Sequence, residues 1–294
     1  MIFVALCLAV LISNITAFTG IENDNVKNSN LFEGDMILTP AQRYAAMIGR
    51  DVSKAGLGRA SIFKNLWPGG VLPYVIGDDI KRSARAMKAI RESMKIWETK
   101  TCIRFKPRTN ERNYAHFYVG QGCTSHVGVQ GGRQLISLAS GCWHTYVTVH
   151  EIGHCLGFYH EQSRPDRDNY VNIYWHNIYP QQKFAFDKYP RSMIDSLGTP
   201  YDYKSIMHYE AYDFSKNGQV TIAAKKPGIV LSNHVGPTDI DIKQMNLLYK
   251  CSGGGGGSSC VNKHYYCDKW ARRGECKKTP RYMRLNCKKS CNIC

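Results

Sequence analysis

The chain has 294 residues, 43% of them hydrophobic, and a formal net charge of +16. This length is enough for one full domain and a small additional unit. Beyond residue 12 no apolar stretch is long enough to cross a membrane as a helix, so we expect no transmembrane segment. A high positive charge can indicate nucleic-acid binding, but half of the excess lies in residues 260–294, where ten Lys and Arg stand against two acids. No nucleic-acid motif accompanies this charge, and we expect no nucleic-acid partner.

The N-terminus begins with an uninterrupted apolar run, IFVALCLAVLI, over residues 2–12. A run of this length is too short to span a bilayer, but it matches the apolar core of a secretory signal peptide. No Lys or Arg precedes the run, and a buried strand or helix is the alternative interpretation. Ala17 is a small residue that offers a cleavage point, although Ile15, two positions earlier, is not the small residue typical of such sites. We therefore expect a signal peptide over residues 1–17 and a secreted, extracellular protein.

Cysteine usage supports an oxidising compartment, because the chain contains twelve cysteines. Cys7 would leave with the signal peptide, and six others fall within residues 260–294, which is the density of a disulfide scaffold. An odd number remains in the body, so one thiol is free or pairs between chains. These five are Cys102, Cys123, Cys142, Cys155 and Cys251.

The first predicted elements follow a polar, weakly patterned segment over residues 18–59. Residues 69–77 have the pattern of a strand. The next segment carries apolar residues at intervals of three or four, which is typical of one face of an amphipathic helix. Asp78 or Asp79 can cap the start of this helix. Its apolar positions are Ile80, Ala84, Met87, Ile90, Met94 and Trp97.

Further strands and a second helix follow in chain order. Short strands are predicted over residues 103–108, 114–120 and 131–139, separated by Gly-rich breaks. Residues 146–158 have a helical period, and the chain from there to Cys251 has an irregular pattern rich in Tyr, Pro and Asn. The segment SGGGGGSS, residues 252–259, is a flexible linker that separates this body from the Cys-rich tail.

The helical segment contains the motif HEIGHCLGFYH. His150 and His154 are four residues apart, so a helix places both imidazoles on one face, where they can bind one Zn²⁺. Gly157 can adopt a left-handed conformation that ends the helix and lets the chain bring His160 to the same metal. Glu151 would point at the fourth position, take a proton from a water there and pass it to the leaving amine.

A helix with a few histidines is the simpler interpretation of HExxH alone. The added Gly and His at these offsets form the extended pattern of the metzincin zinc peptidases, which also requires a methionine turn. The segment SIMHY, residues 205–209, supplies such a turn, with Met207 as the apolar floor beneath the zinc. The sequence therefore predicts a zinc hydrolase.

The chain from about Phe32 to Cys251 closely resembles the astacin family of secreted zinc endopeptidases. The resemblance rests on HEIGHCLGFYHEQSRPDRDNYV, SIMHY, WPGGVLPY and TCIRFKPR. It implies an α+β fold, in which a two-lobed metzincin catalytic domain contains a twisted mixed sheet and two long helices. It also implies one Zn²⁺ per subunit and protein or peptide substrates.

The same resemblance assigns roles to individual residues. Tyr209 would be an additional zinc ligand that moves away to stabilise the transition state, and Glu161 would contact the N-terminus of the mature enzyme. The implied disulfides are Cys102–Cys251 and Cys123–Cys142, which leaves Cys155 as the odd thiol. We interpret Cys155 as a small buried hydrophobe rather than a redox group. Tyr146 departs from the family pattern, in which Gly is common at this position.

The segment FEGD, residues 32–35, matches a propeptide motif of astacin precursors. In these precursors the segment crosses the active site in the direction opposite to substrate, and its Asp binds zinc in place of water. Asp35 would be the blocking ligand here, and Gly34 would let the backbone approach the cleft. We expect a propeptide over residues 18–59, cleavage after Arg59 by a trypsin-like activating protease, and a peptidase domain over residues 60–251.

The tail, residues 260–294, has the spacing C-x₆-C-x₈-C-x₁₀-C-x₃-C-x₂-C and resembles the ShKT module, a small disulfide-rich helical unit. Spacing alone allows 15 connectivities. Family pairing would give Cys260–Cys294, Cys267–Cys287 and Cys276–Cys291. A charged tail of this kind could bind an acidic matrix protein or glycan.

The sequence thus predicts a zinc endopeptidase that is made as an inactive precursor. Substrate would extend along the strand at residues 131–139, taken as an edge strand of the sheet. The alternative is a non-catalytic secreted binding protein or toxin that acts through the ShKT tail. The intact Glu151 and the three histidines argue against this alternative.

Overall fold

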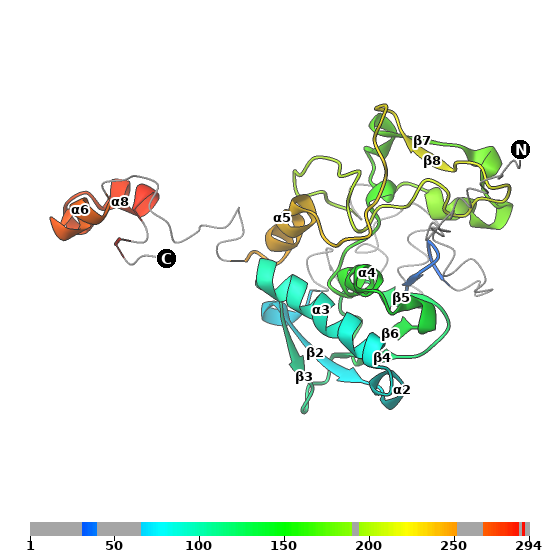
Figure 1. Ribbon diagram of the computed structural model, residues 1–294, viewed down its shortest axis with the longest axis horizontal. Helices are drawn as coiled ribbons and strands as arrows, with labels where there is room; N and C mark the ends of the chain where they lie inside the picture. Colours follow the sequence, from blue (N-terminus) through cyan, green and yellow to red (C-terminus); the bar gives the residue numbers. More distant parts are fainter. Residues whose placement is uncertain (1–30, 40–65, 190–193, 252–266, 288–289, 292–294) are drawn as a thin grey trace, which may run out of the picture.

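The computed structural model describes residues 31–39, 66–189, 194–251, 267–287 and 290–291 (Figure 1). The predicted signal peptide, the cleavage site after Arg59, the Gly/Ser linker and the predicted Cys260–Cys294 bond lie outside these residues. Within the described part of the chain, no helix is both long and apolar enough to span a bilayer.

A six-stranded mixed sheet forms one layer of the body, in the order β1-β5-β6-β4-β2-β3 (Figure 1). Strands β6, β4, β2 and β3 are parallel to one another, whereas β5 is antiparallel to β6. Strand β1 pairs parallel with β5. The strands are β1 (Met36–Ile37), β2 (Val71–Ile76), β3 (Arg104–Pro107), β4 (Tyr114–Tyr118), β5 (Cys123–His126) and β6 (Arg133–Leu138).

Two helices, α3 (Ala84–Lys100) and α4 (Thr145–Cys155), pack against each other and on this sheet (Figure 1). They share a core with the strands, because the buried stripe of α3 continues into the apolar residues of β4 and β6. The Trp97 indole donates to the Val149 carbonyl at 3.2 Å, which fixes α3 against the first turns of α4. This contact positions the helix that carries the HExxH motif.

The predicted amphipathic helix is interrupted near its start. Helix α2 (Asp78–Lys81) ends before Ser83, whose hydroxyl accepts a hydrogen bond from the Ala86 amide at 3.2 Å and caps α3. Neither expected aspartate caps α3. Asp79 instead accepts from the Ile80 and Val119 amides, at 2.9 and 2.7 Å, and so joins α2 to the end of β4. A serine hydroxyl at a helix start competes well for backbone donors, which explains the break.

The strand predicted as the sheet edge is also not the edge. Strand β6 lies between β5 and β4, and β5 is the strand that borders the predicted propeptide. Met36 and Ile37 of β1 align with Ser125 and His126 of β5. The residues of β5 are small and polar, so this strand has little apolar alternation to reveal it in the sequence.

A second lobe with its own hydrophobic core follows α4. Its irregular pattern was predicted, and much of it is turns and irregular backbone with short 3₁₀ segments, among them η6 (Glu161–Ser163) and η9 (Pro180–Phe186). Three elements were missed. They are the antiparallel strands β7 (Val171–Ile173) and β8 (Ile222–Ala224), and helix α5 (Asp239–Leu248). This lobe also contains the short 3₁₀ turns η7 (Arg167–Asn169) and η8 (Trp175–Asn177). Two further 3₁₀ turns, η4 (Pro68–Gly70) and η5 (Ser140–Cys142), precede α4.

Helix α5 begins with a capping box, in which Thr238 and Asp241 each bond the other's backbone amide. Asp241 is 1% exposed and also accepts from the Ser205 hydroxyl at 2.6 Å and the Ile206 amide at 3.0 Å. One carboxylate therefore both starts α5 and holds the segment that contains Met207.

Disulfides connect distant parts of the body. Cys102–Cys251 joins the start of β3 to the end of α5 across 149 residues, and Cys123–Cys142 joins β5 to η5. In the tail, Cys267–Cys287 and Cys276–Cys291 link the short helices α6 (Cys267–Arg272), α7 (Glu275–Lys278) and α8 (Pro280–Asn286). These helices surround a small core of Cys267, Met283 and Cys287.

Candidate active site

Three histidines converge at the C-terminal half of α4 and the turn that follows it. His150 and His154 lie on one face of the helix, and their ring centroids are 4.6 Å apart. Gly157 has a φ of 113°, which ends the helix and returns the chain so that the His160 ring lies 4.8 Å from that of His154. A Cβ at Gly157 would lie 3.2 Å from Leu66 Cδ2, so a larger residue there is strained and crowded.

The outer hydrogen bonds of the histidines orient their rings. Nδ1 of His150 lies 2.7 Å from the Ile206 carbonyl, and Nδ1 of His154 lies 2.8 Å from the Phe158 carbonyl. A carbonyl oxygen can only accept, so both Nδ1 atoms carry the proton and both Nε2 atoms offer a lone pair to the site. Nδ1 of His160 lies 2.6 Å from Glu33 Oε2. All three rings therefore present Nε2 inward.

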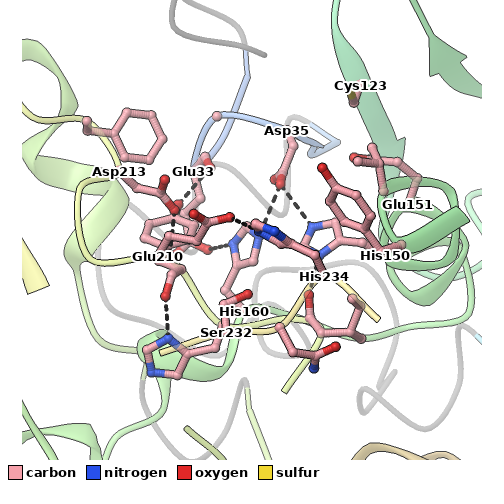
Figure 2. Close-up of a pocket in the computed structure, with 18 residues that line it drawn as sticks. Glu33, Asp35, Cys123, His150, Glu151, His160, Glu210, Asp213, Ser232 and His234 are labelled. Carbon is pink, nitrogen blue, oxygen red and sulfur yellow. Dashed lines mark hydrogen bonds and ion pairs between the residues drawn. The ribbon is translucent and has the colours of Figure 1, made fainter. Parts of the chain in front are cut away.

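Asp35 completes a four-residue cluster with these imidazoles (Figure 2). Its Oδ2 lies 3.1 Å from Nε2 of both His150 and His160, and its Oδ1 lies 3.6 Å from Nε2 of His154. One ligand atom from each of the four residues lies within 4.8 Å of the others.

The cluster fits a zinc ion on the evidence of two buried atoms. Asp35 Oδ1 and His154 Nε2 face one another without a hydrogen-bond partner among the described residues. Buried polar atoms are rarely left in this state unless they bind an ion or a water. Three imidazole nitrogens and one carboxylate oxygen are a donor set that zinc prefers, in the number that tetrahedral coordination needs.

Glu151 and Tyr209 line the same pocket, together with His208, Glu210, Asp213 and His234 (Figure 2). Glu151 follows His150 on α4 and is 1% exposed. The Tyr209 hydroxyl donates to the Glu33 carbonyl at 2.7 Å, and the Tyr209 ring lies 4.8 Å from that of His160. The predicted propeptide thus contacts the hydroxyl to which the family resemblance assigns a catalytic role.

Met207 packs on α4, and Glu161 directly follows the third histidine. Met207 is 2% exposed, and its sulfur would be 3.0 Å from a Cβ placed on Gly153 of α4. The Met207 carbonyl accepts from the Glu161 amide at 3.0 Å. The Glu161 carboxylate in turn accepts from Arg164 at 3.0 Å and from the Asp202 amide at 2.8 Å. Burial raises the pKa of Glu161 to about 7, although Arg164 opposes this shift.

Two residues noted in the sequence lie outside the ligand cluster. The Cys155 thiol is buried, and burial raises its pKa to about 12, which favours the neutral form of the thiol. Tyr146 stacks on His234, with ring centroids 4.7 Å apart, at the wall of the pocket. His234 lies 2.5 Å from Glu210. The side chain at position 146 therefore contributes to the pocket wall and is not part of the histidine cluster.

Sequence reasoning missed two residues near the site. Glu33 occupies the variable position of the F-x-G-D motif, so the motif gave no reason to single it out. Arg164 is 3% exposed and holds Glu161 and Asp166, at 3.0 and 2.8 Å. The partners of Glu33 lie more than 120 residues away in the sequence, whereas those of Arg164 are local charges within an irregular turn, where no helical or strand period indicates a contact.

The two-lobed fold, the histidine cluster and the methionine turn together define a metzincin-type zinc peptidase domain. The family model for the Astacin peptidases matches residues 60–250, and a model for ShK domain-like units matches residues 259–294. The chain belongs to the astacin family, and the zinc that this family uses corresponds to the donor set found here.

Curated relatives and a solved structure agree with this assignment. Zinc metalloproteinase nas-15 of Caenorhabditis elegans is 34% identical over 93% of this chain, and blastula protease 10 of Paracentrotus lividus is 38% identical over 80%. The alignments span 56% and 42% of the length of those two relatives. High choriolytic enzyme 1, a hatching-enzyme zinc protease of Oryzias latipes, is 39% identical with a TM-score of 0.59, over 63% of this chain and 93% of that structure.

Proposed function

We propose that this chain is the precursor of a secreted zinc endopeptidase that is kept inactive by Asp35. The observation that carries the proposal is the placement of the Asp35 carboxylate among three inward-facing Nε2 atoms. His150, His154 and His160 would hold the metal, and Asp35 would occupy the position that a water takes in the active enzyme. Membership of a peptidase family supports the same conclusion.

When bound, zinc would polarise the scissile carbonyl and lower the pKa of the attacking water. Glu151 accepts the proton of that water on its carboxylate and returns it to the leaving amine. Tyr209 is released from the Glu33 carbonyl when the propeptide leaves, and its hydroxyl then donates to the oxygen on which negative charge develops. Met207 packs beneath the ligands and keeps the floor of the site apolar.

The pairing at the sheet edge supports a direction for the bound substrate. Strand β1 pairs parallel with β5. It therefore runs in the direction opposite to that of a peptide that would pair antiparallel with β5 at the same edge. When β1 leaves, β5 offers its free backbone groups to an extended peptide, which we expect to add antiparallel to it. The reversed direction of β1 explains why the precursor can fill its own cleft without placing a peptide bond correctly for cleavage.

Turnover of a fluorogenic peptide by the activated protein tests the proposed function. We expect hydrolysis that a zinc chelator abolishes and that added Zn²⁺ restores. A correctly folded, zinc-loaded protein that cleaves no member of a broad peptide library would favour the alternative of a non-catalytic binding protein.

Tyr209→Phe is expected to lower kcat by roughly 10- to 100-fold, because it removes a hydrogen bond to a developing charge. KM should change little, since the contact is made only in the transition state. Steady-state kinetics of the zinc-loaded variant measure both constants. Tyr212→Phe is the matched control, because Tyr212 is 47% exposed. An increase in KM at unchanged kcat would remove Tyr209 from the catalytic step.

Activation is proposed to occur by cleavage after Arg59, which leaves Ala60 as the new N-terminus. The family match also begins at residue 60. The new amine would approach Glu161, whose buried carboxylate gains most from a charge partner that is shielded from water. N-terminal sequencing of the active protein is expected to start at Ala60. A start at a distant residue such as Asp51 would reject this site.

The ShKT tail is proposed to dock the enzyme on an acidic surface and to leave peptide hydrolysis unchanged. A protein that ends at Cys251 should cleave short peptides normally but elute from heparin at lower salt, because such contacts are screened. A full-length variant with Lys269, Arg272 and Arg273 changed to Gln keeps the cysteines and is the matched control for charge. Equal elution of all forms, or loss of peptide cleavage on truncation, would contradict the proposal.

A further inference from the structure

The three histidines differ in the group that Nδ1 contacts, which is the ring nitrogen that points away from the ligand cluster. His150 and His154 donate to carbonyls of the body, at Ile206 and Phe158. His160 instead meets a carboxylate of the predicted propeptide, Glu33, at 2.6 Å. A carboxylate behind a metal-binding imidazole makes the imidazole a stronger ligand, and loss of such a partner typically weakens metal binding.

Glu33 lies in a site that is built for a carboxylate. The residue is 1% exposed, and both of its carboxylate oxygens are used. Oε2 faces His160 Nδ1, while Oε1 accepts from the Ser163 hydroxyl at 2.7 Å and from the Tyr189 hydroxyl. Ser163 and Tyr189 are themselves buried, at 0% and 3% exposure. Burial of a carboxylate is costly without partners, and these three donors satisfy it.

A tight turn delivers this side chain together with Asp35. Phe32 and Met36 exchange two backbone hydrogen bonds, at 2.8 and 3.0 Å, so residues 33–35 form the tip of a loop. Gly34 has a φ of 91°, and a Cβ there would lie 2.7 Å from the Phe214 ring. Because the turn is fixed in this way, Glu33 and Asp35 reach the two nitrogens of the same imidazole from opposite sides.

We propose that Glu33 is the outer partner of the zinc ligand His160 in the precursor, and that its departure opens a carboxylate-binding socket formed by His160, Ser163 and Tyr189. This inference rests on the proposed role of His160 as a zinc ligand. The propeptide then acts at two points. Asp35 blocks the position of the attacking water, and Glu33 strengthens the metal site from behind.

Zinc retention by the precursor tests the first point. Purified, zinc-loaded Glu33→Gln and wild-type precursors are titrated with a chromogenic chelator, and the apparent zinc Kd is measured for each. Gln has nearly the same shape but no charge, and we expect zinc to bind about 10- to 100-fold more weakly. Ser163→Ala, which leaves the Glu33–His160 contact in place, should have a smaller effect in the same direction. Equal zinc affinity of the wild-type and Glu33→Gln precursors overturns the proposal.

The socket is tested on the activated wild-type enzyme with synthetic peptides, so that no variant has to fold. The peptide LFEGDMIL is compared with LFQGDMIL as an inhibitor of peptide cleavage. The first peptide should inhibit at least about tenfold more strongly, because it adds a charged hydrogen-bonded group to the socket. Equal inhibition overturns the proposal. If the wild-type precursor binds no zinc at all, the proposed function itself fails, and this outcome is separate from equal affinity of the two precursors.

Discussion

Replacement of Glu151 by Gln is expected to leave zinc bound and to reduce turnover by roughly 10²- to 10⁴-fold. The three imidazoles are untouched, and Gln keeps the shape of the buried side chain, but it cannot accept the proton of the attacking water. Zinc content measured by atomic absorption, together with peptide turnover, separates loss of the proton acceptor from loss of the metal.

His154→Ala provides the contrast for this experiment, because it should lose both the zinc and the activity. His154 is fully buried and donates to the Phe158 carbonyl, so its thermal unfolding must be checked as well. A zinc-loaded Glu151→Gln enzyme with near-normal kcat would exclude Glu151 as the general base.

Replacement of Asp35 by Ala in the precursor is expected to release the block on the site and give premature activity. If Asp35 blocks the site in about 99 of 100 precursor molecules, its removal raises the fraction of molecules with an open site by about 100-fold. Precursor activity should rise by the same factor. Peptide turnover before any added protease, and self-cleavage followed on a gel, measure this change.

Asp78→Ala is the control for this variant, because Asp78 is an exposed acid on α2 that pairs only with Lys81 among the described residues. An Asp35→Ala precursor with no more activity than the wild-type precursor would show that Asp35 does not block the site. Residual inhibition in the variant would be attributed to Glu33 and to the β1–β5 pairing, which both remain.

The sequence predicted the convergence of the three histidines because that convergence depends on local spacing. His150 and His154 share a helix face by periodicity alone, and the positive φ of Gly157 was foreseen from the need to end the helix before His160. The apolar stripe predicted for residues 80–97 was equally clear, yet these residues belong to two helices, α2 and α3, which are separated by a break at Ser83. Periodicity reports which face is buried and is insensitive to a single capping residue.

Other features depend on contacts that no spacing encodes. Glu33 meets Tyr189 across 156 residues, and Asp241 meets Ser205 across 36. Strand β5 was missed because its short run of Cys, Thr, Ser and His shows no alternation of apolar and polar residues. The edge of the sheet was consequently assigned to β6. Helix α5 had a Thr–Asp capping pair and apolar residues at Ile242 and Met245, which a closer reading of the spacing would have detected.

The Cys102–Cys251 bond determines which element of the body carries a pull on the tail. If the tail is anchored to a matrix while the body is pulled away, tension reaches the body at Cys251, directly after α5. Without the bond, that tension would unwind α5 from its last turn towards Asp241, which holds the segment beneath the histidines. With the bond, the load passes to Cys102 and into the six-stranded sheet at β3. A pull on the tail therefore bypasses α5 and the Ser205–Ile206 segment that Asp241 holds.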